Sequence, residues 1–255
     1  MRVIDLHVHI LPGLDDGPRW LDESLELARA AVADGTHTLA ATPHVRSDWP
    51  TAPEEMEHAV ESLRAQLAAA EIPLTLLTGG EIAFDALPEL DEATLKRFGL
   101  GGNPRWLLLE TPYSGWPLGL DDAIAELASH GFAVVLAHPE RNGDIAARPE
   151  RLRPLVDAGM LVQLTAASLD GRAGPHARRT AFRLLDLELA HVVATDAHAP
   201  AIRETGIEGA RRALDDDALF DWLTEQVPAA VVAGEPIPAR PPRPTRRLGF
   251  AGFGR

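Results

Sequence analysis

The sequence predicts an α/β fold whose parallel strands curl into a closed or nearly closed barrel. Three observations lead to this prediction. Apolar, strand-like runs alternate with amphipathic or Ala/Leu-rich, helix-like runs along the chain. A repeated strand-then-helix order implies parallel strands joined by right-handed crossovers. Seven such units in one chain favour a barrel over an open sheet.

The first predicted strand lies at the N-terminus and ends in an acidic loop. Asp5, His7 and His9 alternate with apolar residues, which is the period of a strand, so His7 and His9 point to the same side. The loop that follows contains two more carboxylates, Asp15 and Asp16. A His-x-His pair in a strand is more often an ordinary polar pair than a pair of metal ligands. The metal interpretation therefore depends on later segments bringing matching ligands to the same place.

The remaining elements follow in order. Gly35 and Pro43 are typical ends of a helix and of a strand, and Pro53 is typical of a first helical turn. Further strands are predicted at residues 36–42, 74–77, 106–109, 133–137, 161–164 and 191–194, and helices at 21–34, 53–71, 120–130, 149–158, 176–187, 203–214 and 219–226. We expect residues 1–234 to form a single barrel domain. Residues 235–255 are rich in proline and arginine and are expected to form an extended tail.

Composition excludes several classes of function. The net charge is −14 and the pI is about 5.1, which argues against binding nucleic acid or anionic membranes through a basic face. The chain has no cysteine, which excludes disulfides and a cysteine nucleophile. It also has no apolar run of membrane-spanning length and no apolar leader, so we expect a cytoplasmic protein that does not insert into a membrane.

Residues that can bind metal follow the predicted strands. They are His7, His9, His44, Glu81, Glu110, His138, Asp196 and His198. A parallel barrel collects the carboxyl ends of its strands on one face, where the active sites of such folds lie. Imidazoles and carboxylates suit Mn, Fe, Zn or Mg. The set is too large for one ion, so we expect two or three divalent ions, with one of the loop carboxylates, Asp15 or Asp16, as a further ligand.

Six motifs carry a resemblance to a known family. They are DLHVH, LPGLDDG, ATPH, GGEI, AHPERN and TDAH, and in this order they resemble the PHP (polymerase and histidinol phosphatase) metal-dependent phosphoesterases. More narrowly, HILPGLDDG, AHPERN and QLTAASL are similar to the bacterial manganese-dependent protein-tyrosine phosphatases of capsular and exopolysaccharide loci. The likeness runs from about Val3 to His198. It departs at Thr111, where relatives tend to carry an aromatic residue, and at TDAH, which replaces the usual SDAH.

The resemblance implies a fold and a ligand set. It implies a distorted (β/α)7 TIM-like barrel, the PHP fold, with manganese as the expected metal. It would place His7, His9, Glu81 and Asp196 around a first ion, Glu81, Glu110 and His138 around a second, and Asp16, His44 and His198 around a third. The family pattern thus favours Asp16 over Asp15. It also matches Arg141 and Arg203 to phosphate-binding arginines. The alternative for Arg141 is a salt bridge within the Glu140-Arg141 turn. The alternative for Arg203 is a solvated position at the start of a helix.

The same resemblance implies a protein-tyrosine phosphatase whose substrate is a bacterial tyrosine kinase of polysaccharide synthesis. A water activated by two cations would supply the hydroxide that attacks phosphorus. Tyr113, Trp49 and Trp116 could line a phosphotyrosine pocket, with loop packing as an equal alternative. Other functions considered are a phosphoesterase for a small metabolite such as histidinol phosphate, an amidohydrolase on a similar barrel, and a regulator without activity. The oligomeric state is not predicted.

Overall fold

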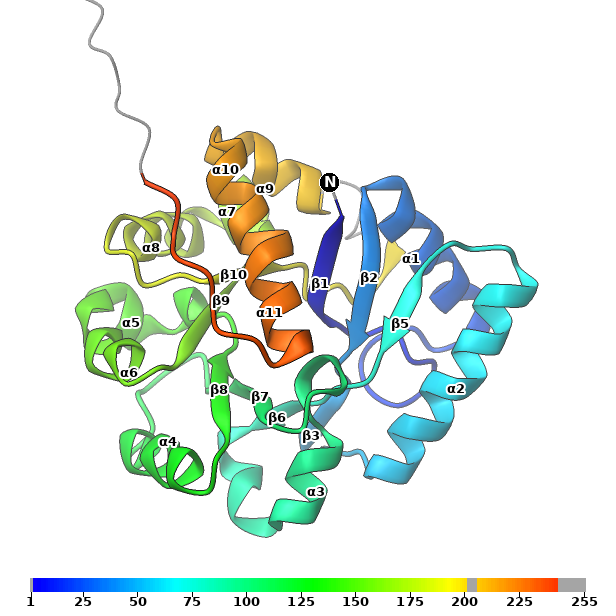
Figure 1. Ribbon diagram of the computed structural model, residues 1–255, viewed down its shortest axis with the longest axis horizontal. Helices are drawn as coiled ribbons and strands as arrows, with labels where there is room; N and C mark the ends of the chain where they lie inside the picture. Colours follow the sequence, from blue (N-terminus) through cyan, green and yellow to red (C-terminus); the bar gives the residue numbers. More distant parts are fainter. Residues whose placement is uncertain (1, 201–205, 243–255) are drawn as a thin grey trace, which may run out of the picture.

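The strands form two sheets that curl around a common core. The computed structural model describes residues 2–200 and 206–242. A three-stranded sheet has the order β1 (Val3–Val8), β2 (Thr36–Ala41), β5 (Thr75–Leu77). A seven-stranded sheet has the order β10 (Val192–Ala194), β9 (Leu161–Thr165), β8 (Ala133–Leu136), β7 (Trp106–Glu110), β6 (Glu81–Ala83), β3 (His44–Arg46), β4 (Trp49–Pro50). Figure 1 shows these strands as a ring.

The strand pairs are parallel except for the short β3–β4 hairpin. The two sheets meet where Val8 forms a parallel bridge with Ala197. There the His9 amide donates to the Ala197 carbonyl at 3.0 Å, and the Asp196 amide donates to the His7 carbonyl at 2.8 Å. The prediction of an α/β fold with a curled, mostly parallel sheet is confirmed, although the sheet is divided in two.

Each predicted strand has a counterpart, but the structure adds β3, β4 and β6. Pro43 and the Gly79-Gly80 pair interrupt two predicted strand–loop segments, and the chain then resumes as β3 and β6 in the second sheet. Proline lacks the amide that a strand ladder needs, and glycine weakens a strand. As a correction to the sequence analysis, His44 and Glu81 therefore open short strands instead of following long ones.

Helices surround the ring of strands (Figure 1). They are α1 (Leu21–Ala33), α2 (Pro53–Ala69), α3 (Glu92–Arg97), α4 (Leu120–Ser129), α5 (Gly143–Ala147), α6 (Arg153–Asp157), α7 (Ala166–Asp170), α8 (Pro175–Asp186), α9 (Gly206–Leu214), α10 (Asp217–Asp221) and α11 (Val227–Ala233). The predicted helix 149–158 is instead a 3-10 turn, Pro149–Leu152, followed by α6. Among the helices of the described residues, none has the length and apolar character that crossing a membrane requires.

One end of the ring is covered by α11 and by the segment after it. In Figure 1, α11 lies across the middle of the ring. Asn103, three residues before β7, donates from Nδ2 to the Val231 carbonyl at 2.6 Å. Further along the chain, Trp222 Nε1 donates to the Pro238 carbonyl at 3.0 Å, and Arg240 donates to carbonyls before β10. The covered end is the one where strands begin, so the carboxyl ends of the strands face the other way.

Strands β7 and β9 are buried along their whole length. This is expected for parallel strands that have helices outside and a packed interior. Most of their residues are leucine, valine or tryptophan, but Glu110 and Gln163 are buried as well. A buried polar side chain costs free energy unless it is hydrogen-bonded or binds a cation. These two positions therefore indicate where the core gives way to a polar site.

Candidate metal centre

The predicted ligands converge at the carboxyl ends of the strands. In the described part of the chain, four groups of histidine and carboxylate side chains each have ligand atoms within 4.8 Å of one another. The groups are His9, Asp16, His44 and His198; His7, Glu81 and His138; His7, His9 and Asp196; and His44, Glu81 and Glu110. The nine ligands that the resemblance implies each belong to at least one group, and Asp15, the alternative to Asp16, belongs to none. The structure thus brings the predicted set together.

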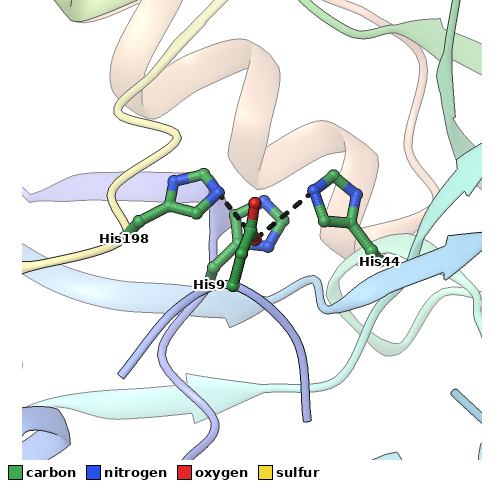
Figure 2. Close-up of side chains that lie close together, drawn as sticks. His9, His44 and His198 are labelled. Carbon is green, nitrogen blue, oxygen red and sulfur yellow. Dashed lines mark ion pairs between the residues drawn. The ribbon is translucent and has the colours of Figure 1, made fainter. Parts of the chain in front are cut away.

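The site has a buried interior and a more open edge. His7 and His9 are fully buried, and Glu81 is 1% exposed. Asp16 and His198 have side chains that are 45% and 25% exposed. Figure 2 shows the rings of His9, His44 and His198 close together, with dashed lines for ion pairs; Asp16 Oδ1 lies 3.2 Å from His198 Nε2 and 3.5 Å from His44 Nε2. Solvent therefore reaches the site from the Asp16 side.

The geometry of His7 and His9 suits metal ligation. Their Nε2 atoms lie 3.2 Å apart, and each is 3.3 Å from Asp196 Oδ1. His9 Nδ1 donates to Asp15 Oδ2 at 2.6 Å, and His7 Nδ1 donates to Gln163 Oε1 at 3.1 Å. In a neutral imidazole the nitrogen opposite the protonated one carries a lone pair. Both rings are therefore held in the tautomer that presents Nε2 to the same point, as metal-ligating histidines are.

Glu81 lies at the centre of the set. One of its oxygens is 2.9 Å from His138 Nε2, and the other is 2.9 Å from His44 Nδ1. The contact with His44 does not have hydrogen-bond geometry, so both His44 Nδ1 and Glu81 Oε2 are buried without a hydrogen-bond partner among the described residues. Such orphaned donors and acceptors fit a site for cations. The membership of Glu81 in two groups also fits a carboxylate that bridges two ions.

The charges of the cluster shift its pKa values strongly. Burial alone would lower the pKa of His7, but the charges of Glu81 and Asp196 outweigh it and raise this pKa to about 9. Burial would raise the pKa values of Glu81 and Asp196, yet the charge of His7 and contacts with other histidines hold both well below their usual range. Burial, together with the charge of Glu81, raises the pKa of Glu110. The site is thus a tightly coupled set of charges that favours bound cations.

Asp15 and Asp16 have different environments, which separates the two carboxylates that the sequence alone could not distinguish. Asp15 is buried: its Oδ2 accepts from His9 Nδ1 and from the His44 amide, and its Oδ1 accepts from the Gly17 amide. A β-carbon at Gly17 would lie 2.4 Å from the His9 carbonyl oxygen, so this close turn requires glycine. Asp15 therefore orients a histidine, whereas Asp16 faces the ligand group.

Gln163, which is outside the predicted ligand set, supports two of its members. Its Oε1 accepts from His7 Nδ1 at 3.1 Å and from the His138 amide at 3.2 Å. It thus fixes the ring of one candidate ligand and the backbone of another. The sequence contained a signal for this role, because Gln163 is a polar residue near the end of an otherwise apolar predicted strand. That signal does not distinguish a supporting residue from ordinary polar packing.

The backbone is strained at two candidate ligands. His138 has φ 32° and Asp196 has φ 52°, in the left-handed region that residues other than glycine rarely adopt. Both lie two residues after the end of a strand, His138 after β8 and Asp196 after β10. Backbone strain of this kind concentrates at functional sites, where the surrounding structure holds it in place. The two turns direct these side chains back over the end of the sheet.

Arg141 lies at the edge of the cluster. Its Nη1 donates to Asp196 Oδ2 at 2.6 Å, and its side chain is 22% exposed. The guanidinium therefore pairs with a candidate ligand, while Glu140 accepts from the Thr165 amide through Oε1. A planar, partly exposed guanidinium beside a cation site is suited to bind phosphoryl oxygens. Arg203, the second predicted phosphate contact, lies outside the described residues.

Comparison with solved structures supports the same fold. The crystal structures of YwqE from Bacillus subtilis and CpsB from Streptococcus pneumoniae, described as metal-dependent tyrosine phosphatases, include a chain with a TM-score of 0.83 and 31% identity, covering 96% of this chain and 100% of that one. A β-aspartyl dipeptidase from Fervidobacterium islandicum matches with a TM-score of 0.58 at 13% identity, covering 90% of this chain and 72% of that one. The second likeness shows a shared fold only.

Sequence comparison defines the family. The tyrosine-protein phosphatase YwqE of Bacillus subtilis is 34% identical over 255 residues, which cover 98% of this chain and all of the relative. The tyrosine-protein phosphatase CpsB of Streptococcus pneumoniae is 28% identical over 205 residues, which cover 77% of this chain and 83% of the relative. The model of the family described as capsular polysaccharide synthesis, CpsB/CapC, matches residues 3–221. This chain therefore belongs to the CpsB/CapC family of capsular polysaccharide synthesis.

Proposed function

We propose that this protein is a metal-dependent tyrosine-protein phosphatase. The observation that carries the proposal is the convergence of histidine and carboxylate ligand atoms at the strand ends, with the Arg141 guanidinium beside them. The phosphatases named among its relatives support the substrate class. Amide hydrolysis, the chemistry of the more distant dipeptidase, has no need of a guanidinium placed to hold a phosphoryl group.

We propose that the site holds two or three divalent ions, with manganese as the physiological metal. His7, His9, Glu81 and Asp196 would hold the first, Glu81, Glu110 and His138 the second, and Asp16, His44 and His198 the third. When bound, such ions supply Lewis-acid charge against phosphoryl oxygens and activate water for attack on phosphorus. The orphaned atoms of His44 and Glu81, and the two facing Nε2 atoms, support a role in holding cations.

The chain's own residues would bind and orient the phosphoryl group. Arg141 is already paired with Asp196, so its guanidinium is fixed in direction and keeps further N–H donors for the substrate. Arg203 is proposed as a second phosphate contact. Tyrosine needs little help to leave, because its unperturbed pKa is about 10, far below that of the serine hydroxyl. The role of the protein is therefore mainly to position the ester and stabilise its charge.

We further propose that the substrate is a phosphotyrosine protein, and specifically a bacterial tyrosine kinase of polysaccharide synthesis. The description of the family as a capsular polysaccharide synthesis family supports this proposal. The acidic net charge of −14 fits a protein substrate better than a nucleic acid.

Metal add-back to chelated protein tests the proposed function. Hydrolysis of a phosphotyrosine peptide should disappear on chelation, return with Mn²⁺, and be lost in His138→Ala. His58→Ala is the matched control, because His58 is exposed on α2, outside the ligand groups. Faster hydrolysis of histidinol phosphate than of the peptide would overturn the substrate class. Full activity without any metal would overturn the metal dependence.

A further inference from the structure

A groove leads away from the candidate metal centre at Glu110. Its volume is about 530 Å³, which is within the ~300–1,000 Å³ range of small-molecule sites. Its lining includes Arg46, Ala83, Phe84, Glu110, Pro112 and Tyr113. Trp49 and Trp116, which the sequence analysis also considered for a substrate pocket, are outside this lining in the described structure. Glu110 belongs to both the groove and a ligand group, so the two spaces adjoin.

The register of the sheet explains why there is room beside the cluster. Glu81 and Ala83 are two residues apart on β6, so their side chains point to the same side. Ala83 lies opposite Glu110 on β7. A small side chain therefore follows the central ligand on its own strand, and the space above Ala83 is left open. A bulky residue at this position would fill the groove next to Glu110.

The wall of the groove is aromatic and partly exposed. Tyr113 is 56% exposed although it is large and hydrophobic, and its ring centroid lies 6.0 Å from that of His138. Phe84, immediately after β6, is half-buried. An exposed aromatic side chain beside a polar site offers a flat surface on which another ring can stack. The wall therefore suits an aromatic group whose polar end reaches the metal centre.

The loop that carries Tyr113 is held in place. Asn142 donates from Nδ2 to the carbonyls of Pro112 and Gly115, at 2.7 and 3.0 Å. The Gly143 amide donates to the Tyr113 carbonyl at 3.0 Å. Asn142 follows Arg141 in the chain, so the aromatic wall and the guanidinium are attached to the same short segment. Their relative position is thereby fixed.

Arg46 is the cationic side chain among the residues that line the groove, and it is already paired with carboxylates. Arg46 forms a two-pronged ion pair with Asp48, with contacts of 2.7 and 3.1 Å, and its Nη1 lies 3.7 Å from Glu110 Oε2. Because two carboxylates offset its charge, Arg46 does not make the groove a second phosphate site. The groove therefore differs in chemistry from the phosphate end at Arg141.

From these features we propose that the groove binds the phenyl ring of phosphotyrosine, with Tyr113 as the stacking surface and Ala83 as the floor. This inference rests on the proposed phosphatase function and assigns the specificity of that same site. The phosphoryl group would lie at the cluster, and the ring would extend from Glu110 toward Tyr113. A serine or threonine phosphate has no ring to place there, so the groove selects for tyrosine.

Two variants separate binding of the ring from binding of phosphate. Tyr113→Ala should raise the KM for a phosphotyrosine peptide about 2- to 10-fold, the size of one lost aromatic contact. The Kd of a non-hydrolysable phosphonomethyl-phenylalanine peptide on manganese-loaded protein should rise equally. The inhibition constant of inorganic phosphate should rise by less than these two constants, because phosphate does not enter the groove and Tyr113 affects it only through its hydrogen bond to Arg141. Tyr113→Phe should restore most of the lost affinity, and Ala83→Leu should weaken peptide binding by filling the groove.

The controls distinguish the possible failures. Leu118→Ala alters a residue that is 98% exposed and outside the groove lining, and it should change neither constant. Metal content and thermal midpoint should be unchanged in Tyr113→Ala. Peptide affinity that is unaffected in both Tyr113→Ala and Ala83→Leu, or that changes in step with phosphate affinity, would overturn the groove assignment. Wild-type protein that binds phosphate but hydrolyses no phosphotyrosine would refute the proposed function as well.

Discussion

The Nε2 atoms of His7 and His9 face each other at 3.2 Å in the interior of the protein. Each ring is turned to this position by a hydrogen bond from its other nitrogen, to Gln163 and to Asp15 respectively. Two lone pairs at this distance repel each other unless a proton or a cation lies between them. Protons and metal ions therefore compete for the same place, and the first two predictions follow from this competition.

Metal binding should release protons. Without metal the pKa of His7 is about 9, because the charges of Glu81 and Asp196 outweigh its burial, so at pH 7 the ring is protonated. A histidine must lose its extra proton before it can bind a metal, so metal binding displaces protons and the apparent affinity should rise with pH, about tenfold per unit for each proton released. Calorimetric titration of Mn²⁺ into chelated protein, in two buffers of different ionisation enthalpy, measures the release. Identical heats in both buffers would contradict it.

The chelated protein should become less stable as the pH rises from 6.5 to 9. A histidine whose pKa is raised by folding stabilises the protein fully below its unfolded value of about 6.5, and this contribution is lost as the pH passes through the folded value. His7 and His9 are both raised, and the loss should be on the order of 2 kcal/mol. The lowered pKa values of His191 and His198 affect the stability below pH 6.5, outside this interval.

Urea unfolding at several pH values measures how the free energy of unfolding of the chelated protein changes with pH. The manganese-loaded protein is the comparison, and its stability should increase over the same interval because fewer protons compete with the metal. Parallel pH slopes for the chelated and loaded forms would contradict the competition between protons and metal.

Gln163→Leu should weaken metal binding about 10- to 100-fold, the usual cost of losing a hydrogen bond that orients a ligating histidine. The substitution removes the acceptor for His7 Nδ1 and for the His138 amide. Gln163→Glu keeps an acceptor at the same place and should retain more of the affinity. Competition with a chromophoric chelator gives both dissociation constants. Equal affinities of Gln163→Leu and wild type would show that Gln163 only fills space.

Asp15→Ala and Asp16→Ala should have different effects. Asp15 accepts three hydrogen bonds in a buried loop, so its loss should lower the free energy of unfolding by on the order of 3 kcal/mol in chelated protein. Asp16 is nearly half exposed, so its loss should change that free energy by less than about 0.5 kcal/mol while reducing the bound metal. Chemical denaturation and elemental analysis separate the two. The reverse pattern would exchange the roles of the two residues.

Asn142→Asp should raise the KM for phosphotyrosine without unfolding the protein. The aspartate keeps the Oδ1 that accepts from the Asp144 and Ile145 amides at the start of α5. It loses the two N–H donors that hold the loop carrying Tyr113. Steady-state kinetics beside a thermal melt measures both effects, and Asn142→Ala, which also loses the helix cap, should be the less stable variant. A KM equal to that of wild type would show that the loop needs no such support.

Much of the fold follows from patterns that are local in the sequence. The alternation around His7 and the long apolar runs predicted strands that the structure contains. Pro43 is typical of a strand end, and Gly79-Gly80 follows the predicted strand 74–77, but at both places the chain crosses from one sheet to the other and forms a new strand. A local pattern shows where a strand is interrupted, but only the packing of the whole chain decides whether it resumes. Whether a short segment such as α3 or α7 forms a helix likewise depends on the packing of the whole chain.

In the candidate site, too, some features could be predicted from the sequence and others depend on the folded chain. Residues with metal-binding side chains near strand ends could be named from the sequence, because a parallel sheet gathers such ends on one face. The distinct environments of Asp15 and Asp16 could not be derived from the residues, since they depend on backbone amides of Gly17 and His44 that fold against Asp15. The support from Gln163 and Asn142 likewise arises from contacts between distant segments.

The junction of the two sheets has a consequence for how the protein matures. The Thr195 amide and hydroxyl donate to the Asp5 carboxylate, 190 positions earlier in the chain. Contacts between such distant residues form late, because the intervening chain must be ordered before they can close. His7 and Asp196 flank this junction, so their ligand group is assembled only in the finished fold. A nascent chain that has not yet formed β10 and the turn at Asp196 therefore lacks this ligand group.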